Sequence, residues 1–176
     1  SLKPRRVDFT NSDGVQFSDH YTYLDGYPAI LSLHKHVEDE QCTEKKILFK
    51  SGTCLPDRVQ FKTDRMADFR DEVVYQSYDS NSNVCEIMAK DDTPVLFIWG
   101  YRNRYPIAKI ENATRQQVSV ALGYDGDIGD VFGDWASLAV PTKEIWDKIN
   151  SLREKLPSNT RVTTYEYAPL QGVVSI

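Results

Sequence analysis

The segment from Val73 to Thr114 constrains the fold more than any other part of the chain, because strand-like stretches alternate in it with strong turn signals. Val73–Tyr78 and Val84–Ala89 have strand character and are joined by a turn rich in Asp, Asn and Ser. A second turn at 91–94 leads into the apolar stretch 95–99. This layout predicts an antiparallel β-meander in which 95–99 is a central strand buried on both faces.

Residues 1–70 carry the same mixture of short strands and turns. The Asp-Gly step at 13–14 separates two strand-like stretches and is typical of a tight hairpin. The stretch 29–37 alternates in period two, which places His34 and His36 on one face of a strand. Strands are predicted here at 6–10, 15–23, 29–37, 46–49 and 58–61.

The part of the chain after the meander has helical signals. Thr114 and Gln117 have the spacing of a capping box, in which each side chain bonds the other residue's backbone N–H. Gly123 can supply the left-handed residue that ends a helix. We therefore predict a short helix over about 114–122, a stretch that begins at the cap and stops before this glycine.

A second helix is predicted from Pro141 or Thr142 to just before Pro157. Its apolar residues recur at helical spacing and form one stripe that faces a core, namely Ile145, Ile149, Leu152 and Leu156. Between the two helices, 124–135 is an acidic, glycine-containing segment that we expect to be a loop.

Together these patterns predict an α+β fold, an antiparallel β-meander sheet with two helices inserted in the C-terminal half. The 176 residues fit a single domain or a fragment of a larger repeat protein. Its predicted parts are a β-rich N-terminal part (1–70), the meander (71–111), a helical insertion (112–158) and return strands (159–176). Because the last strand has barely begun at Ile176, we expect the natural chain to continue.

Composition excludes some classes of function. The formal net charge is −5, so the chain is a poor partner for the phosphates of nucleic acid. The longest apolar stretch, 95–99, is strand-sized, so no membrane span is expected in this segment. The three cysteines, Cys42, Cys54 and Cys85, form no C-x-x-C pair, and either one disulfide or three free thiols fits their number.

Three segments resemble the YD-repeat proteins, the RHS-like envelope and secreted proteins of Gram-negative bacteria. They are the turn 78–83 (YDSNSN), the block 93–114 with its Trp-Gly-Tyr and Ile-Glu-Asn-Ala-Thr steps, and 162–172 (VTTYEYAPLQG). The resemblance covers about residues 70–176. Ser82 stands where the family has glycine, and Asp92 stands where a Lys-Asp-Gly turn is typical, so both positions are expected to need a positive φ.

The resemblance implies a non-enzymatic structural or interaction module, located outside the cytoplasm in the cell envelope or in a secreted protein. Its partners would be neighbouring repeats of the same chain or another protein, because repeat units bury their faces only against neighbours or caps. No cofactor is expected.

Two groups of residues have the composition of metal sites. His34, His36 and Glu38 alternate along one strand, so their side chains share a face at steps of about 7 Å and could bind a transition metal. Asp125 and Asp127, with Asp130, could supply oxygen ligands for calcium. The alternatives are a wet strand face and a solvated acidic loop.

The chain contains no G-x-S-x-G, H-E-x-x-H or P-loop motif, so no enzymatic activity is predicted. A second interpretation is a carbohydrate-binding module, with or without the assistance of calcium, because exposed aromatic rings beside the acidic loop could line a sugar groove. The candidate rings are Trp99, Tyr101, Tyr105, Trp135 and Trp146. A third reading, a metal-dependent hydrolase, requires a cleft that joins His34, His36 and Glu38.

Overall fold

The computed structural model describes residues 3–126, 128–168 and 172–175. The chain divides into two compact units, unit 1 (Ser1–Tyr75) and unit 2 (Gln76–Ile176), and each is described by itself. The α+β class and the antiparallel β-meander are confirmed, because neighbouring strands within each unit pair antiparallel and follow one another in chain order.

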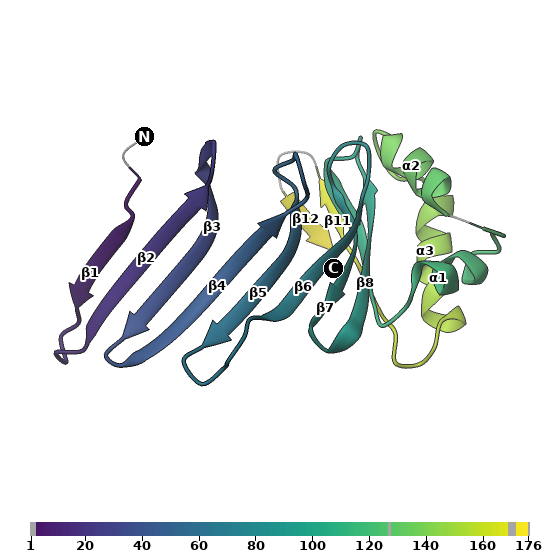
Figure 1. Cartoon of the computed structure of the whole chain (residues 1–176). Coiled ribbons are helices and arrows are strands. Elements are labelled where there is room, and N and C mark those ends of the chain that lie inside the picture. The colour runs from purple at the N-terminus through teal and green to yellow at the C-terminus, as the bar shows by residue number, and fades with distance from the viewer. Residues whose placement is uncertain (1–2, 127, 169–171, 176) are drawn as a thin grey trace. The chain divides into compact units, whose positions relative to one another are not determined.

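Unit 1 consists of the successive strands of a meander (Figure 1). They are β1 (Arg6–Thr10), β2 (Gln16–Leu24), β3 (Tyr27–Glu38), β4 (Gln41–Phe49), β5 (Pro56–Thr63) and β6 (Arg70–Tyr78), whose last residues belong to unit 2. The register between β1 and β2 follows from the predicted hairpin, and Gly14 in its turn has a φ of 86°.

Unit 1 has almost no core of its own. Among its described residues, Val59 is the one hydrophobic side chain that is buried, at 8% exposure. Val7, Phe9 and Tyr27 are 39%, 46% and 50% exposed. Most other apolar residues on β2–β5 are only half-buried, so the strands of this unit carry apolar side chains that remain in partial contact with water.

Unit 2 holds the helices and the remaining strands. Its elements are β7 (Val84–Ala89), the 3-10 turn η1 (Lys90–Asp92), β8 (Thr93–Gly100), β9 (Tyr105–Glu111), α1 (Arg115–Ala121), α2 (Gly129–Ser137), α3 (Lys143–Lys155), β10 (Arg161–Thr164), β11 (Glu166–Ala168) and β12 (Gly172–Ser175). The strands β7 to β10 pair in sequence order, and β11 and β12 form a separate hairpin. None of the described helices has the length and apolarity needed to cross a membrane.

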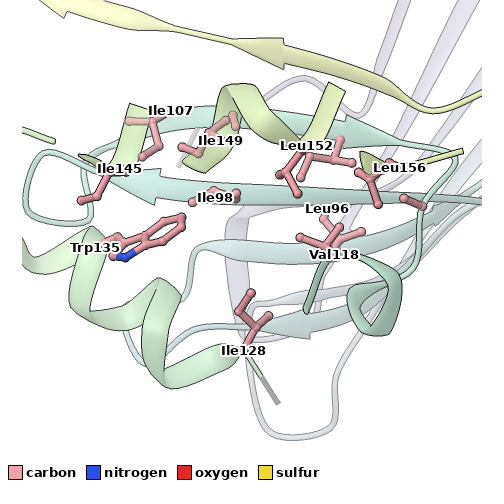
Figure 2. Packing of buried hydrophobic residues seen from close by; sticks show 13 residues of the cluster. Leu96, Ile98, Ile107, Val118, Ile128, Trp135, Ile145, Ile149, Leu152 and Leu156 are labelled. Atoms are coloured by element: carbon pink, nitrogen blue, oxygen red, sulfur yellow. The ribbon is translucent and has the colours of Figure 1, made fainter. Parts of the chain in front are cut away.

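The core of unit 2 lies between β8 and β9 on one side and the helices on the other (Figure 2). Ile98 and Ile107 on the strands and Ile149 and Leu152 on α3 are all completely buried. The predicted stripe of α3 is therefore confirmed as its buried face. Burying a side chain of this size stabilises a fold by about 1.5–3 kcal/mol, so this cluster is the main source of stability in unit 2.

The helix ends agree with the predicted caps. The Thr114 hydroxyl accepts a hydrogen bond from the Gln117 N–H at 3.3 Å, and the Gln117 side chain accepts from the Thr114 N–H at 2.8 Å. Gly123 follows α1 with a φ of 81°. Thr142 caps α3 by accepting from the Ile145 N–H at 3.3 Å. These bonds satisfy backbone donors that a helix start otherwise leaves unpaired.

A third helix, α2, occupies much of the segment 124–135 that was expected to be a loop, so the loop prediction was wrong for residues 129–135. A loop was predicted because Gly129, Asp130 and Gly133 are poor helix formers. The apolar residues Ile128 and Trp135 nevertheless lie two turns apart and are 0% and 7% exposed. Packing of this apolar side against the core outweighs the weak local propensity.

The turn at Ser82 offers a test of backbone strain. Ser82 has a φ of 67°, and Asp79 Oδ1 fixes the same turn by accepting from the N–H groups of Asn81 and Asn83 at 2.8 Å each. Because a left-handed conformation costs a non-glycine residue roughly 1–2 kcal/mol, we expect Ser82→Gly to raise the free energy of unfolding by about 1 kcal/mol. Urea denaturation measures this free energy of unfolding. Ser80→Gly, at a position without positive φ, should not raise it. Equal effects of the two substitutions would contradict this interpretation.

Candidate functional site

The first candidate site is a cluster of two histidines around one carboxylate on the strands β2 and β3 of unit 1. Asp19 lies opposite His36 in the antiparallel register, and Tyr21 lies opposite His34. Asp19 Oδ1 is 2.9 Å from His34 Nε2 and 2.7 Å from His36 Nδ1. The Asp19 side chain is 16% exposed, and the two imidazoles are 35% and 32% exposed. The Tyr21 ring stacks on His34 at 5.0 Å.

This arrangement favours the ionised form of Asp19. The hydrogen bond from His36 is the largest cause that lowers the pKa of Asp19, and the bond from His34 adds to it, while partial burial acts in the opposite direction. Each imidazole thus spends one nitrogen on the carboxylate, which fixes the orientation of both rings.

A pH dependence of stability follows from the lowered pKa of Asp19. A carboxyl group whose pKa is lower in the folded than in the unfolded chain stabilises the fold above its unfolded pKa of about 3.9. This contribution is lost as the pH falls through the lowered, folded pKa. We expect Asp19→Asn to flatten the pH dependence of thermal stability between about pH 5 and pH 2. Asp25→Asn, in an exposed turn, is the control, and a profile as steep in Asp19→Asn as in the wild type would contradict the assignment.

The predicted transition-metal residues are only partly brought together. His34 and His36 share the cluster with Asp19, whereas Glu38 lies opposite Phe17 and Gln41, further along β3. A hollow of about 350 Å³ beside the histidines is lined also by Thr43, Glu44, Lys45, Phe61 and Glu72, and not by Glu38. Within the described ranges, no three His, Cys, Asp or Glu side chains are arranged to hold a metal ion.

The residue that sequence reasoning missed here is Asp19. The sequence did contain a signal for this pairing. The turn at 25–26 joins the two predicted strands, and period-two alternation places Asp19 on the face that His36 also occupies. The exact register could not be read from the pattern, because it shifts at Thr22 and Tyr23.

The second candidate site is a cleft of about 650 Å³ that lies entirely within unit 2. It is bounded by the turn 78–81, by β7 and β8, and by α2. Its lining residues are Tyr78, Asp79, Ser80, Asn81, Cys85, Leu96, Phe97, Trp99, Asn103, Arg115, Gly129, Asp130, Phe132, Gly133, Asp134, Ala136 and Ser137. This volume is in the range of small-molecule sites, about 300–1,000 Å³.

One wall of the cleft is held by an unusual turn between β8 and β9. Tyr101, Arg102 and Asn103 are consecutive left-handed residues with φ of 52°, 59° and 60°. The N–H of Arg102 donates to the carbonyl of Leu138 and that of Asn103 to the carbonyl of Ala136, both at 2.8 Å. These bonds satisfy carbonyls at the C-terminal end of α2, so they offset the strain of the turn and fix α2 against it.

The aromatic part of the cleft is also fixed in place. The Trp99 indole N–H donates to the carbonyl of Val84 at 2.8 Å, and the Asn83 amide donates to the carbonyl of Asn103 at 3.0 Å. Cys85 is a poor nucleophile here, because burial raises the pKa of its thiol. Cys42, Cys54 and Cys85 are all free thiols.

The residues predicted to bind calcium are separated by the start of α2. Asp130 lies in the first turn of α2 and lines the cleft together with Asp134, one turn further on. Asp125 precedes the helix and does not line the cleft. Asp127 lies outside the described residues, so the complete set of three is not described.

The aromatic residues predicted for a sugar groove also separate. Trp99 lines the cleft, whereas Trp135 is buried in the core at 7% exposure. Tyr101 and Tyr105 instead form a cluster with Tyr167 of β11, in which the rings of Tyr105 and Tyr167 stack at 4.8 Å.

Comparisons of the chain with protein-family models, with curated proteins and with solved structures find no match.

Proposed function

We propose that this chain is a non-enzymatic structural and interaction module of a YD-repeat, RHS-like envelope or secreted protein. In this role the strands of unit 1 form part of a longer β-structure. Neighbouring repeats of the same chain, or another protein, cover the apolar side chains that unit 1 leaves exposed. The observation that carries the proposal is the missing core of unit 1, in which Val59 is the one buried hydrophobic residue among those described.

A unit of this size cannot be very stable when so few of its apolar side chains are buried. A domain of about 60 residues buries only about 60% of the surface of its unfolded chain and is marginal even with a regular core. Unit 1 spans residues 1–75 but leaves about half of the surface of Phe9 and Tyr27 exposed, 46% and 50%. Repeat units share this property, since each one buries its apolar side chains against the next. The half-buried apolar residues on β2–β5 therefore support a partner of the same kind, another layer or further strands.

The outer edge of β1 is consistent with further strands. The Tyr21 N–H donates to the Arg5 carbonyl at 2.9 Å, and the Asn11 N–H donates to the Val15 carbonyl at 3.1 Å. In an antiparallel pair the hydrogen-bonded positions alternate, so odd-numbered residues of β1 bond β2. The N–H and C=O groups of Arg6, Asp8 and Thr10 then point to the outer edge, where another strand can pair with them.

The test is to extend the chain with the segments that flank it in its parent gene. We expect flanking Tyr-Asp repeats, and we expect the extended chain to raise the melting temperature of unit 1 by about 5 °C or more. An extension of equal length built from Gly and Ser is the control. A parent gene without further Tyr-Asp repeats, or natural flanks that stabilise unit 1 no more than the Gly/Ser control, would refute the proposal.

A further inference from the structure

We propose that the cleft of unit 2 binds a neutral carbohydrate, with a pyranose ring against the aromatic residues and its hydroxyl groups on the polar residues that line the cleft. This inference concerns a ligand site in unit 2 and is independent of the proposed structural role, which depends on unit 1. It is carried by the composition of the cleft, by the glycine at its helical wall and by the rigidity of its supports.

The charges in the cleft disfavour an anionic ligand. Three carboxylates line the cleft, those of Asp79 in the turn and of Asp130 and Asp134 on α2, and one guanidinium lines it, that of Arg115 at the start of α1. An anionic ligand would meet three carboxylates, and a cationic ligand would meet Arg115, so the lining opposes an anion most strongly. A hydroxyl group both donates and accepts, so it can bond carboxylate, guanidinium and amide groups alike. A neutral ligand rich in hydroxyl groups can therefore donate hydrogen bonds to the carboxylates of the cleft.

The apolar lining points to a ligand that also has a carbon face. Phe97, Trp99 and Phe132 line the same cleft as the charged residues. A pyranose ring has this double character, because its C–H groups form an apolar face while its hydroxyl groups project around the rim. Small-molecule sites commonly combine such aromatic surface with a few convergent polar groups.

Gly133 gives a second, separate indication that the cleft is kept open for a ligand. It lies inside α2, where glycine is less favourable than alanine by about 0.8–1 kcal/mol. A Cβ atom built on Gly133 would meet no atom within 4 Å, so packing inside the protein does not require glycine there. Because Gly133 lines the cleft, a side chain at this position would project beside the ligand space instead. The glycine thus lowers helix stability in favour of an open cleft.

The supports of the cleft are rigid, which reduces the entropy lost on binding. Trp99 is anchored through its indole N–H to the Val84 carbonyl, so its ring keeps one orientation. The left-handed residues 101–103 fix the end of α2 through the two bonds at 2.8 Å. Consecutive strained residues persist only where their surroundings hold them, and such strain is concentrated at binding sites.

The test is an NMR titration of the full 176-residue chain, labelled with ¹⁵N, with neutral trisaccharides of glucose, galactose and mannose at up to about 10 mM, where weak binding is measurable. Putrescine and glucuronate are the cationic and anionic probes. We expect at least one neutral trisaccharide to saturate and to shift amides at 97–103 and 129–137, in the presence of EDTA as well as without it. We expect neither charged probe to bind as tightly.

Variants of the cleft separate binding from folding. Gly133→Ala should leave the protein as stable or more stable, and Gly133→Leu should weaken binding at least about tenfold because its side chain fills the cleft. Asp134→Asn should weaken binding, and Asp147→Asn, on the exposed side of α3, is the matched control that should not.

Any of four results would overturn the inference. The first is the absence of saturable binding by any neutral trisaccharide, and the second is unchanged affinity in a folded Gly133→Leu variant. The third is tighter binding of putrescine or glucuronate. Binding that disappears with EDTA would also contradict it, because the ligand would then be held through an ion.

Discussion

Replacement of Leu152 by alanine should lower the free energy of unfolding of unit 2 by about 3–4 kcal/mol, the largest effect that we expect from a single substitution. Leu152 is completely buried on α3 and belongs to the cluster that joins this helix to β8 and β9 (Figure 2). Removing its branched side chain loses apolar burial and leaves a cavity in a small core that can relax only partly. Trp135 lies in the same cluster, so tryptophan fluorescence during urea denaturation should report the change.

The matched control is Val140→Ala. Val140 lies just before α3 and is 63% exposed, so its substitution should change stability by less than about 0.5 kcal/mol. A loss below about 1 kcal/mol for Leu152→Ala would mean that the cluster does not hold unit 2 together.

Gly100→Ala should be the second most damaging substitution, with a loss of about 2–3 kcal/mol. A Cβ atom at this position would lie 2.6 Å from Ile107 Cγ2 and 3.3 Å from Pro141 Cγ. Ile107 is completely buried, so it has little room to move aside. Gly100 is the glycine of the Trp-Gly-Tyr step, and this contact explains why β8 and β9 need the smallest residue there.

A double-mutant cycle tests the cause of this loss. Ile107→Ala removes the methyl group that an added Cβ would meet, so the double variant should lose less stability than the sum of the two single variants, by at least about 1 kcal/mol. Additive losses would show that the clash with Ile107 is not the cause. Gly133→Ala provides the opposite control, since it adds the same methyl group in open space.

The regular parts of the fold could be predicted from local pattern alone. β1 and β7 have the predicted bounds, and the capping residues Thr114 and Thr142 begin α1 and α3. These predictions succeed because alternation, caps and turn residues act over a few positions. The left-handed φ at Ser82 and Asp92 belongs to the same class, because the resemblance places both in turns that need it.

The features that depend on distant residues were harder to predict. The helix α2 forms because Ile128 and Trp135 are buried by β8 and the other helices, which overrides the weak propensity of its glycines. The turn at 101–103 is stable only because carbonyls at the end of α2 accept its N–H groups. No local pattern indicates a contact between segments about 35 residues apart.

The candidate sites show the same limit. The sequence singled out some residues of both sites, namely His34 and His36 at the first site and Asp130 and Trp99 at the second. Asp19 reaches the two histidines through strand register, and Trp99 and Asp130 line one cleft because α2 packs beside β8. Chemistry that depends on such convergence becomes visible only when the register is known.

The most direct test of the proposed role is hydrogen exchange of backbone amides, measured by mass spectrometry on the 176-residue chain. The missing core of unit 1 predicts that amides of β1–β5 exchange at least about 100-fold faster than those of β8, β9 and α3, because local opening should cost much less there. Equal protection of both sets of amides would show that unit 1 is stable without a partner. That result would contradict its role as part of a longer β-structure.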